Sequence, residues 1–116
     1  MEASRLHMQG VLEKVMEDAG EAPHVYFQPP ESMKMVYPCI VYHMPSIDTI
    51  YSNNLPYGHI VEFNVKYITR DPTSKVPRKL LSLPQNRFDT YYTAENLHHY
   101  AYTITSTLKE VDYDTT

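Results

Sequence analysis

Apolar and polar residues alternate most clearly in residues 59–69. One side of the alternation contains Val61, Phe63, Val65 and Tyr67, and the other contains Glu62, Asn64, Lys66 and Ile68. Successive side chains of a β-strand point to opposite faces, so this pattern predicts a strand with one buried and one largely wet face. A sheet built on such a strand needs cover on one side only, which is typical of antiparallel sheets.

An amphipathic helix is predicted near the N-terminus, over residues 4–19. Ser4 is its expected N-cap, and Gly20 stands where a left-handed residue ends a helix. Apolar residues recur at three- and four-residue steps, which puts them on one face of the helix. They are Met8, Val11, Leu12, Val15, Met16 and Ala19.

Prolines and turn residues divide the middle of the chain into short segments. A short strand is predicted over residues 24–28, stopped by Pro29 and Pro30, and another over residues 39–44, closed by Pro45. A third strand is predicted at residues 48–52, and residues 53–58, which follow it, are of types typical of a turn. Because the strand at 59–69 comes next, these two strands are expected to form an antiparallel hairpin.

The second half of the chain predicts one short helix and two strands. Ser74 is the expected N-cap of this helix, Pro77 lies in its first turn, and Pro84 ends it. Strands follow at residues 87–93 and 97–108, and in the second of them His98 and His99 point to opposite faces. The whole order predicts a single α+β domain over residues 1–116, a mostly antiparallel sheet with both helices on one face.

The composition excludes several classes of chemistry. The three glycines are far apart, so no glycine-rich phosphate loop exists. The six histidines lack metal-ligand spacing, and the single Cys39 excludes an internal disulfide and is expected in a buried strand. Asp89 and Glu95 flank two tyrosines, and they are either the polar wall of a pocket or else solvated residues or salt-bridge partners. We therefore expect no catalytic residues, metal or cofactor, and no enzyme.

The charges are divided unevenly along the chain. The net charge is −4 at pH 7, with acidic residues gathered in the first helix and the tail. Three interpretations of the basic group stay open: a solvated helix face, a patch for single-stranded nucleic acid, or a surface for head-to-tail contacts between identical copies. This group surrounds the second helix and consists of Arg70, Lys75, Arg78, Lys79 and Arg87. No apolar run approaches the roughly 20 residues of a membrane-spanning helix.

Short motifs along residues 8–108 resemble the tail-completion, or tail-terminator, proteins of long-tailed bacteriophages. They are the strand YPCIVY (37–42), a strand that ends in DPTS (71–74), a short helix that ends in LP (83–84), the pair FD (88–89) and the strand start ENLHH (95–99).

The resemblance implies a structural virion protein of the tail and neck, assembled in the host cytoplasm. Such subunits form a hexameric ring that caps the last layer of the major tail-tube protein, stops tube growth and offers the surface that joins the head through a head–tail connector or head-closure protein. DNA passes through the pore without specific binding. The alternatives are another neck component, such as a head-closure or connector protein, or a small nucleic-acid- or metal-binding module.

Residues near predicted loops and strand ends are the expected contacts of such a ring. Tyrosine offers large, rigid contact area, and arginine and lysine can meet an acidic neighbour. The alternative is that the tyrosines and asparagine are ordinary core or turn residues, and that the basic ones form a solvated helix face. The expected contact residues are Asn53, Tyr57, Arg78, Lys79, Arg87, Tyr91 and Tyr92.

Overall fold

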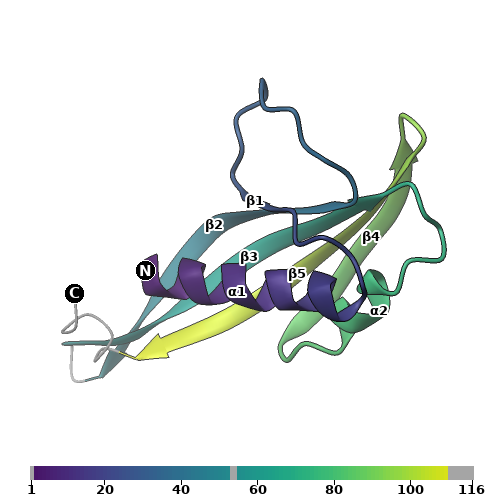
Figure 1. Cartoon of the computed structure of the whole chain (residues 1–116). Helices are drawn as coiled ribbons and strands as arrows, with labels where there is room; N and C mark the ends of the chain where they lie inside the picture. The colour runs from purple at the N-terminus through teal and green to yellow at the C-terminus, as the bar shows by residue number, and fades with distance from the viewer. Residues whose placement is uncertain (1, 53–54, 110–116) are drawn as a thin grey trace.

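The computed structural model describes residues 2–52 and 55–109, which form a five-stranded sheet with two helices on one face (Figure 1). The sheet order is β1-β2-β3-β5-β4, with β1 parallel to β2 and every other pair antiparallel. The predicted α+β fold is thus confirmed. The elements are α1 (Glu2–Asp18), β1 (Val25–Phe27), β2 (Cys39–Ser52), β3 (Leu55–Thr69), α2 (Val76–Leu81), β4 (Asn86–Ala94) and β5 (Leu97–Lys109).

Helix α1 ends as predicted but begins earlier. It starts at Glu2, so Ser4 lies inside the helix and the predicted N-cap is wrong. At the other end Gly20 has a φ of 80°, the left-handed conformation that glycine adopts without a Cβ penalty. The Gly20 N–H donates to the Glu17 carbonyl, and the Glu21 N–H donates to the Met16 carbonyl. This pair of bonds is a Schellman motif, which satisfies the last carbonyls of the helix.

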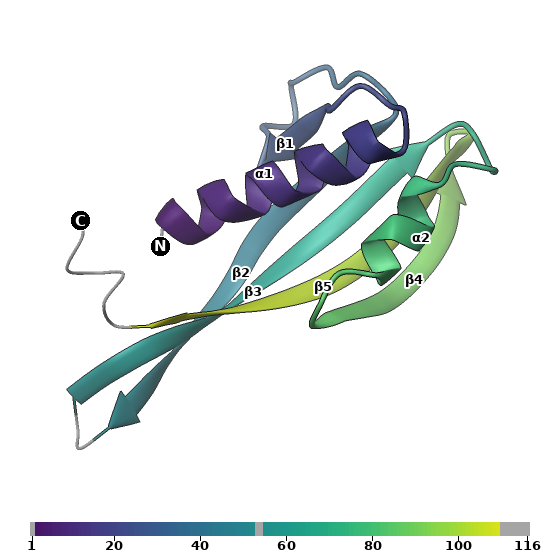
Figure 2. The same cartoon turned by 60° about the horizontal axis from the view of Figure 1, so that its bottom comes forward.

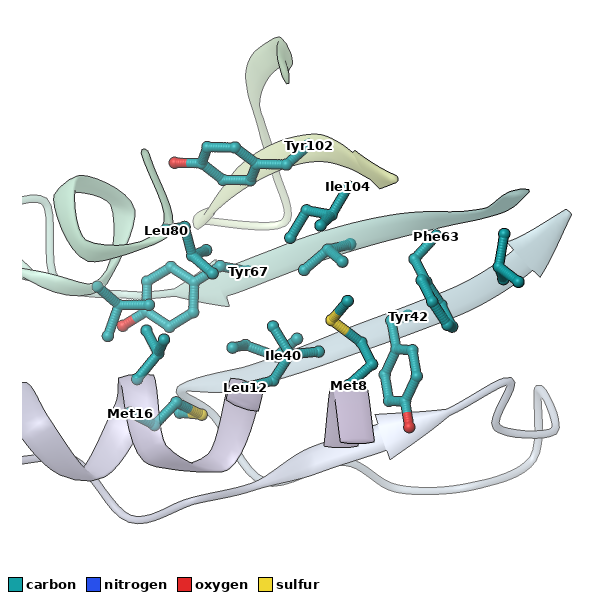
Figure 3. Close-up of a cluster of buried hydrophobic side chains, with 14 residues drawn as sticks. Met8, Leu12, Met16, Ile40, Tyr42, Phe63, Tyr67, Leu80, Tyr102 and Ile104 are labelled. Atoms are coloured by element: carbon teal, nitrogen blue, oxygen red, sulfur yellow. The ribbon is translucent and has the colours of Figure 1, made fainter. Parts of the chain in front are cut away.

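The core lies between α1, α2 and one face of the sheet (Figure 3). The alternation predicted for β3 is confirmed, because the four residues expected on its buried side, Val61, Phe63, Val65 and Tyr67, are at most 1% exposed. The predicted face of α1 supplies the other side, with Leu12 and Met16 fully buried. The buried Tyr42 keeps its hydroxyl satisfied by donating to Gln9 Oε1 at 2.6 Å.

The β2–β3 hairpin is confirmed, but its strands are longer than predicted. Residues 39–44 and 48–52 form one strand, β2, with Pro45 inside it. Proline is tolerated there because the pairing with β3 shifts register between His43 and Ser46, where regular ladder bonds are interrupted. The predicted turn at 53–58 is too long, since β3 already begins at Leu55.

Helix α2 is shorter than predicted. Its N-cap is Lys75 rather than Ser74, although Ser74 Oγ still accepts a hydrogen bond from the Val76 N–H at 3.3 Å. The helix ends at Leu81, before Pro84. Val76 and Leu80 are fully buried, as the apolar stripe predicts.

The opposite face of the sheet is not wholly wet. A smaller apolar cluster forms there from Cys39, Val41, Ile68 and Leu97, and it is covered by Tyr26, Met35 and Tyr37 from β1 and the segment after it. Ile68, expected on a largely wet face, is therefore only 5% exposed. Cys39 is fully buried, as predicted.

One polar network fastens α1 to the connection that leads into α2. The Tyr67 hydroxyl donates to Glu21 Oε1 at 2.6 Å and lies 2.7 Å from Ser74 Oγ, which donates to Glu21 Oε2 at 2.8 Å. Burial, and then the hydrogen bond to Glu21, raise the pKa of the Tyr67 phenol, so it stays protonated as a donor. The network fixes the start of α2 relative to the sheet.

Two leucines of α1 offer a matched test of this packing. We expect Leu12→Ala to lower the free energy of unfolding by about 3 kcal/mol, because it leaves a cavity in the core. Leu6→Ala makes the same chemical change at a site that is 54% exposed, so its effect should stay within about 0.5 kcal/mol. Urea unfolding followed by circular dichroism measures both, and equal losses in the two variants would contradict the packing of α1.

Candidate interaction surface at the α2–β4 edge

Strand β4 forms one edge of the sheet, and its side chains are unusually exposed. One side of the strand pairs with β5, and no strand in the described part of the chain lies on its other side. Only Asn86 is partly buried, and the remaining residues of β4 are exposed. Three of them are large aromatics, namely Phe88 (45% exposed), Tyr91 (44%) and Tyr92 (38%). Unpaired backbone beside exposed aromatic side chains is typical of a contact surface.

A tight turn holds β4 against β5. Ala94 pairs with Leu97, so only Glu95 and Asn96 connect the two strands, and both have positive φ, 53° and 64°. Two successive positive φ values are typical of a type I′ hairpin turn, whose twist matches that of the strands. Glu95 is thus an exposed turn residue, and the interpretation of Asp89 and Glu95 as walls of one pocket finds no support, because they line separate hollows.

The two tyrosines of β4 lie on opposite faces, and a histidine of β5 supports each of them. Tyr91 Oη lies 2.5 Å from His98 Nδ1, and the two rings stack. On the other face Tyr92 stacks on His99, with ring centroids 4.6 Å apart and planes within 4°. The predicted opposition of His98 and His99 is therefore confirmed. Both tyrosine rings are held before any partner arrives, which reduces the entropy that a contact would cost.

Lys66 of β3 completes the Tyr92 side of the edge. Its Nζ lies 5.6 Å from the centre of the Tyr92 ring, within cation–π range. Burial, and then the positive charge of Lys66, lower the pKa of His99, while the backbone at Ala94 acts in the opposite direction. The stacked imidazole therefore favours its neutral form.

Arg87 is held in place by an ion pair with Asp89, which lies at a β-bulge of β4. The pairing of β4 with β5 shifts register between Phe88 and Thr90, which leaves Asp89 as an extra residue. Arg87 Nε donates to Asp89 Oδ1 at 2.8 Å, and the Thr103 hydroxyl donates to Asp89 Oδ2 at 2.6 Å. Burial acts to raise the pKa of Asp89, but these hydrogen bonds and the charge of Arg87 outweigh it, so the pKa is lowered overall.

Helix α2 adjoins the same edge (Figure 2). Tyr102 Oη donates to the Pro77 carbonyl at 3.0 Å, and Asn86 Nδ2 donates to the Leu81 carbonyl at 2.9 Å. Arg78 and Lys79 occupy the last turn of the helix, where cations interact favourably with its dipole.

The structure thus gathers most of the predicted contact residues on two neighbouring elements, which we call the α2–β4 edge. Asn53 lies outside the described residues, and Tyr57 lies in β3 but its side chain is outside the described part. The sequence did not predict the exposure of Leu81 and Phe88, because an apolar residue in a strand or helix is ordinarily expected in the core. The α2–β4 edge consists of Arg78, Lys79, Leu81, Arg87, Phe88, Tyr91 and Tyr92.

A reactive cysteine and a metal-binding cluster are both absent from the part of the chain that the structure describes. Burial raises the pKa of the Cys39 thiol to about 12, so the thiolate, which is the nucleophilic form, is scarce at neutral pH. Among residues 2–52 and 55–109, no group of three or more His, Cys, Asp and Glu side chains is placed to hold a metal ion. Within the same residues no helix combines the length and apolar character needed to cross a bilayer.

No family model matches this chain, and no curated protein matches it.

The single cysteine, Cys39 of β2, provides a test of the smaller apolar cluster to which it belongs. We expect Cys39 in the folded protein at pH 8 to resist a thiol reagent, because the thiol is inaccessible and only about one molecule in ten thousand is ionised there. In urea the same thiol should react at once. Ser32→Cys, which adds a thiol at an exposed position, is the control and should react in the folded state. Fast reaction of native Cys39 would refute its burial.

Proposed function

We propose that this protein is the tail terminator of a long-tailed bacteriophage. In this role it assembles as a hexameric ring on the end of the tail tube and ends tube polymerisation. The ring also gives the connector of the head a surface to join. The single observation that carries the proposal is the α2–β4 edge, whose exposed aromatic strand pairs with β5 on one side and with no other described strand on its outer side. The resemblance of several short motifs to those of tail-completion proteins is the reason for proposing this particular assembly.

The backbone edge of β4 supports an assembly role. A soluble monomer usually blocks its sheet edges with charge, proline or a covering element. From Thr90 to Ala94 the strand carries neither charge nor proline, and every residue is exposed. An edge of this composition pairs readily with another strand, which favours a subunit whose working state is an assembly.

The side chains of the edge support the same role. Tyrosine and arginine are the residue types enriched where contacts contribute most to binding. Tyr91 and Tyr92 are each stacked on a histidine, and Arg87 is anchored by Asp89. Such side chains lose little freedom when a partner binds, so more of the contact energy contributes to affinity.

A ring adds one requirement, namely that each copy uses two different surfaces. A surface that pairs with itself gives a two-fold dimer, whereas contacts between unlike surfaces propagate and close into a ring when the rotation between neighbouring copies allows it. The α2–β4 edge is one such surface. Tube end and connector then bind the faces of the ring, and the net charge of −4 is compatible with DNA passing without tight binding.

Electron microscopy of the protein mixed with its major tail-tube protein tests the proposal. We expect rings on one end of the tubes, and tubes that no longer grow when more tube protein is added. A head-closure or connector protein would instead leave tube length unchanged. A chain that stays monomeric in native mass spectrometry, both alone and with tubes, would refute the proposal.

The tyrosines of β4 provide the matching mutational prediction. Tyr91→Ser combined with Tyr92→Ser should weaken self-association about a hundredfold, since each ring contributes on the order of 1–2 kcal/mol at a contact. Val36→Ser removes a 55% exposed apolar side chain from the segment between β1 and β2 and is the control. Sedimentation measures both variants, and an equal effect of the control would contradict a role for the α2–β4 edge.

A further inference from the structure

A second open edge lies on the opposite side of the sheet. Strand β1 pairs only with Ile40, Val41 and Tyr42, although β2 continues to Ser52. Beyond Tyr42, no strand of the described residues lies along the outer side of β2. Figure 2 shows this part of the β2–β3 hairpin extending past both helices.

The two open edges match in length and regularity. The pairing of β2 with β3 is regular over residues 46–50, between two register shifts. The pairing of β4 with β5 is regular over residues 90–94, from the shift after Phe88 to the turn. Each segment thus has five residues, about 17 Å of strand. Both consist mainly of β-branched, aromatic and small residues, SIDTI and TYYTA, which suit a strand.

We propose that residues 90–94 of one copy pair with residues 46–50 of the next copy, so that the sheet continues from subunit to subunit. This inference rests on the proposed function and names the contact that builds the ring. The two segments lie toward opposite ends of the strand order, so each copy offers one of each kind. Contacts between unlike edges propagate in one direction, as ring formation needs.

Charge and exposed apolar surface favour this partner over a second β4. When the two five-residue segments are aligned, the exposed Asp48 lies opposite Tyr92 on the same face, and Lys66 Nζ lies 5.6 Å from the centre of the Tyr92 ring. The opposite charges of Asp48 and Lys66 favour this pairing, whereas an antiparallel β4–β4 pair centred on Tyr92 brings two copies of Lys66 toward each other. Ile47, 36% exposed, adds apolar surface to the β2 segment. A β4–β4 pair would also stop at two copies and leave the β2 edge unused.

Cross-linking between engineered cysteines tests the pairing directly. Ser46→Cys and Thr93→Cys each place one thiol on one of the two edges, at exposed positions where the fold tolerates the change. The native Cys39 is fully buried, so it should not react with the cross-linker. A short bis-maleimide avoids the strict geometry of a disulfide. We expect a linked dimer when the two variants are mixed, and none from either variant alone. A chain carrying both changes should give a ladder of linked species.

The alternative outcomes overturn the inference. Linkage by Thr93→Cys alone would show a two-fold β4 contact, and a mixture that links no better than the exposed control Ser32→Cys would show no pairing of these edges. A wild-type chain that stays monomeric at every concentration, both alone and with tail tubes, would also overturn it. If the protein caps tubes but the cross-links form at other positions, the contact proposed here is wrong and the tail function stands. If the cross-links form as proposed but the linked rings never cap tubes, the contact stands and the tail function is wrong.

Discussion

The burial of one face of β3 is the constraint on which the molecule depends. Val61, Phe63, Val65 and Tyr67 are removed from water because both helices lie across that face. Leu12 and Met16 of α1 and Val76 and Leu80 of α2 belong to the same buried cluster. Two helices are enough to cover this side of the sheet, and a short apolar segment after β1 covers part of the other. The fold therefore completes its core while no further strand of the described residues lies beside the outer edge of β4, or beside that of β2 beyond Tyr42.

Tyr67 connects this core to the α2–β4 edge. Its ring is part of the buried face of β3, and its hydroxyl belongs to the network with Glu21 and Ser74. Because Ser74 also accepts from the N–H of Val76, the network fixes the first turn of α2. Tyr102, in turn, binds the Pro77 carbonyl and contacts Phe88, with ring centroids 5.3 Å apart. The position of the exposed edge thus follows from buried contacts.

Periodicity made the long segments predictable. The apolar spacing of α1 and the alternation of β3 repeat over many residues, so each local pattern agrees with the final fold. The errors occur at single residues whose meaning depends on tertiary context. Pro45 ends a strand in isolation, yet a register shift accommodates it inside β2. Ser4 is a good cap by type, but the helix begins before it.

The candidate surface was predictable in most of its residues, although not in Leu81 and Phe88, and its geometry was not predictable. Tyr91 and Tyr92 could be placed on opposite faces by alternation alone. Their stacking on His98 and His99 depends on the register of β4 with β5, which the two-residue turn at Glu95 and Asn96 sets. Glutamate is not typical at a positive φ, so the pair Glu95-Asn96 carries no clear turn signal in the sequence. The order of strands, which makes β4 an edge, is likewise absent from any local pattern.

Short open edges have a consequence for when assembly occurs. Register shifts and turns limit each regular segment to five residues, so a single contact between two free copies is weak. A closed ring has one more contact than an open chain of the same copies, and a surface that holds the copies side by side makes each further contact intramolecular. A ring joined through such edges therefore forms poorly in solution and readily on a template. In the function proposed above, the end of the tail tube is that template.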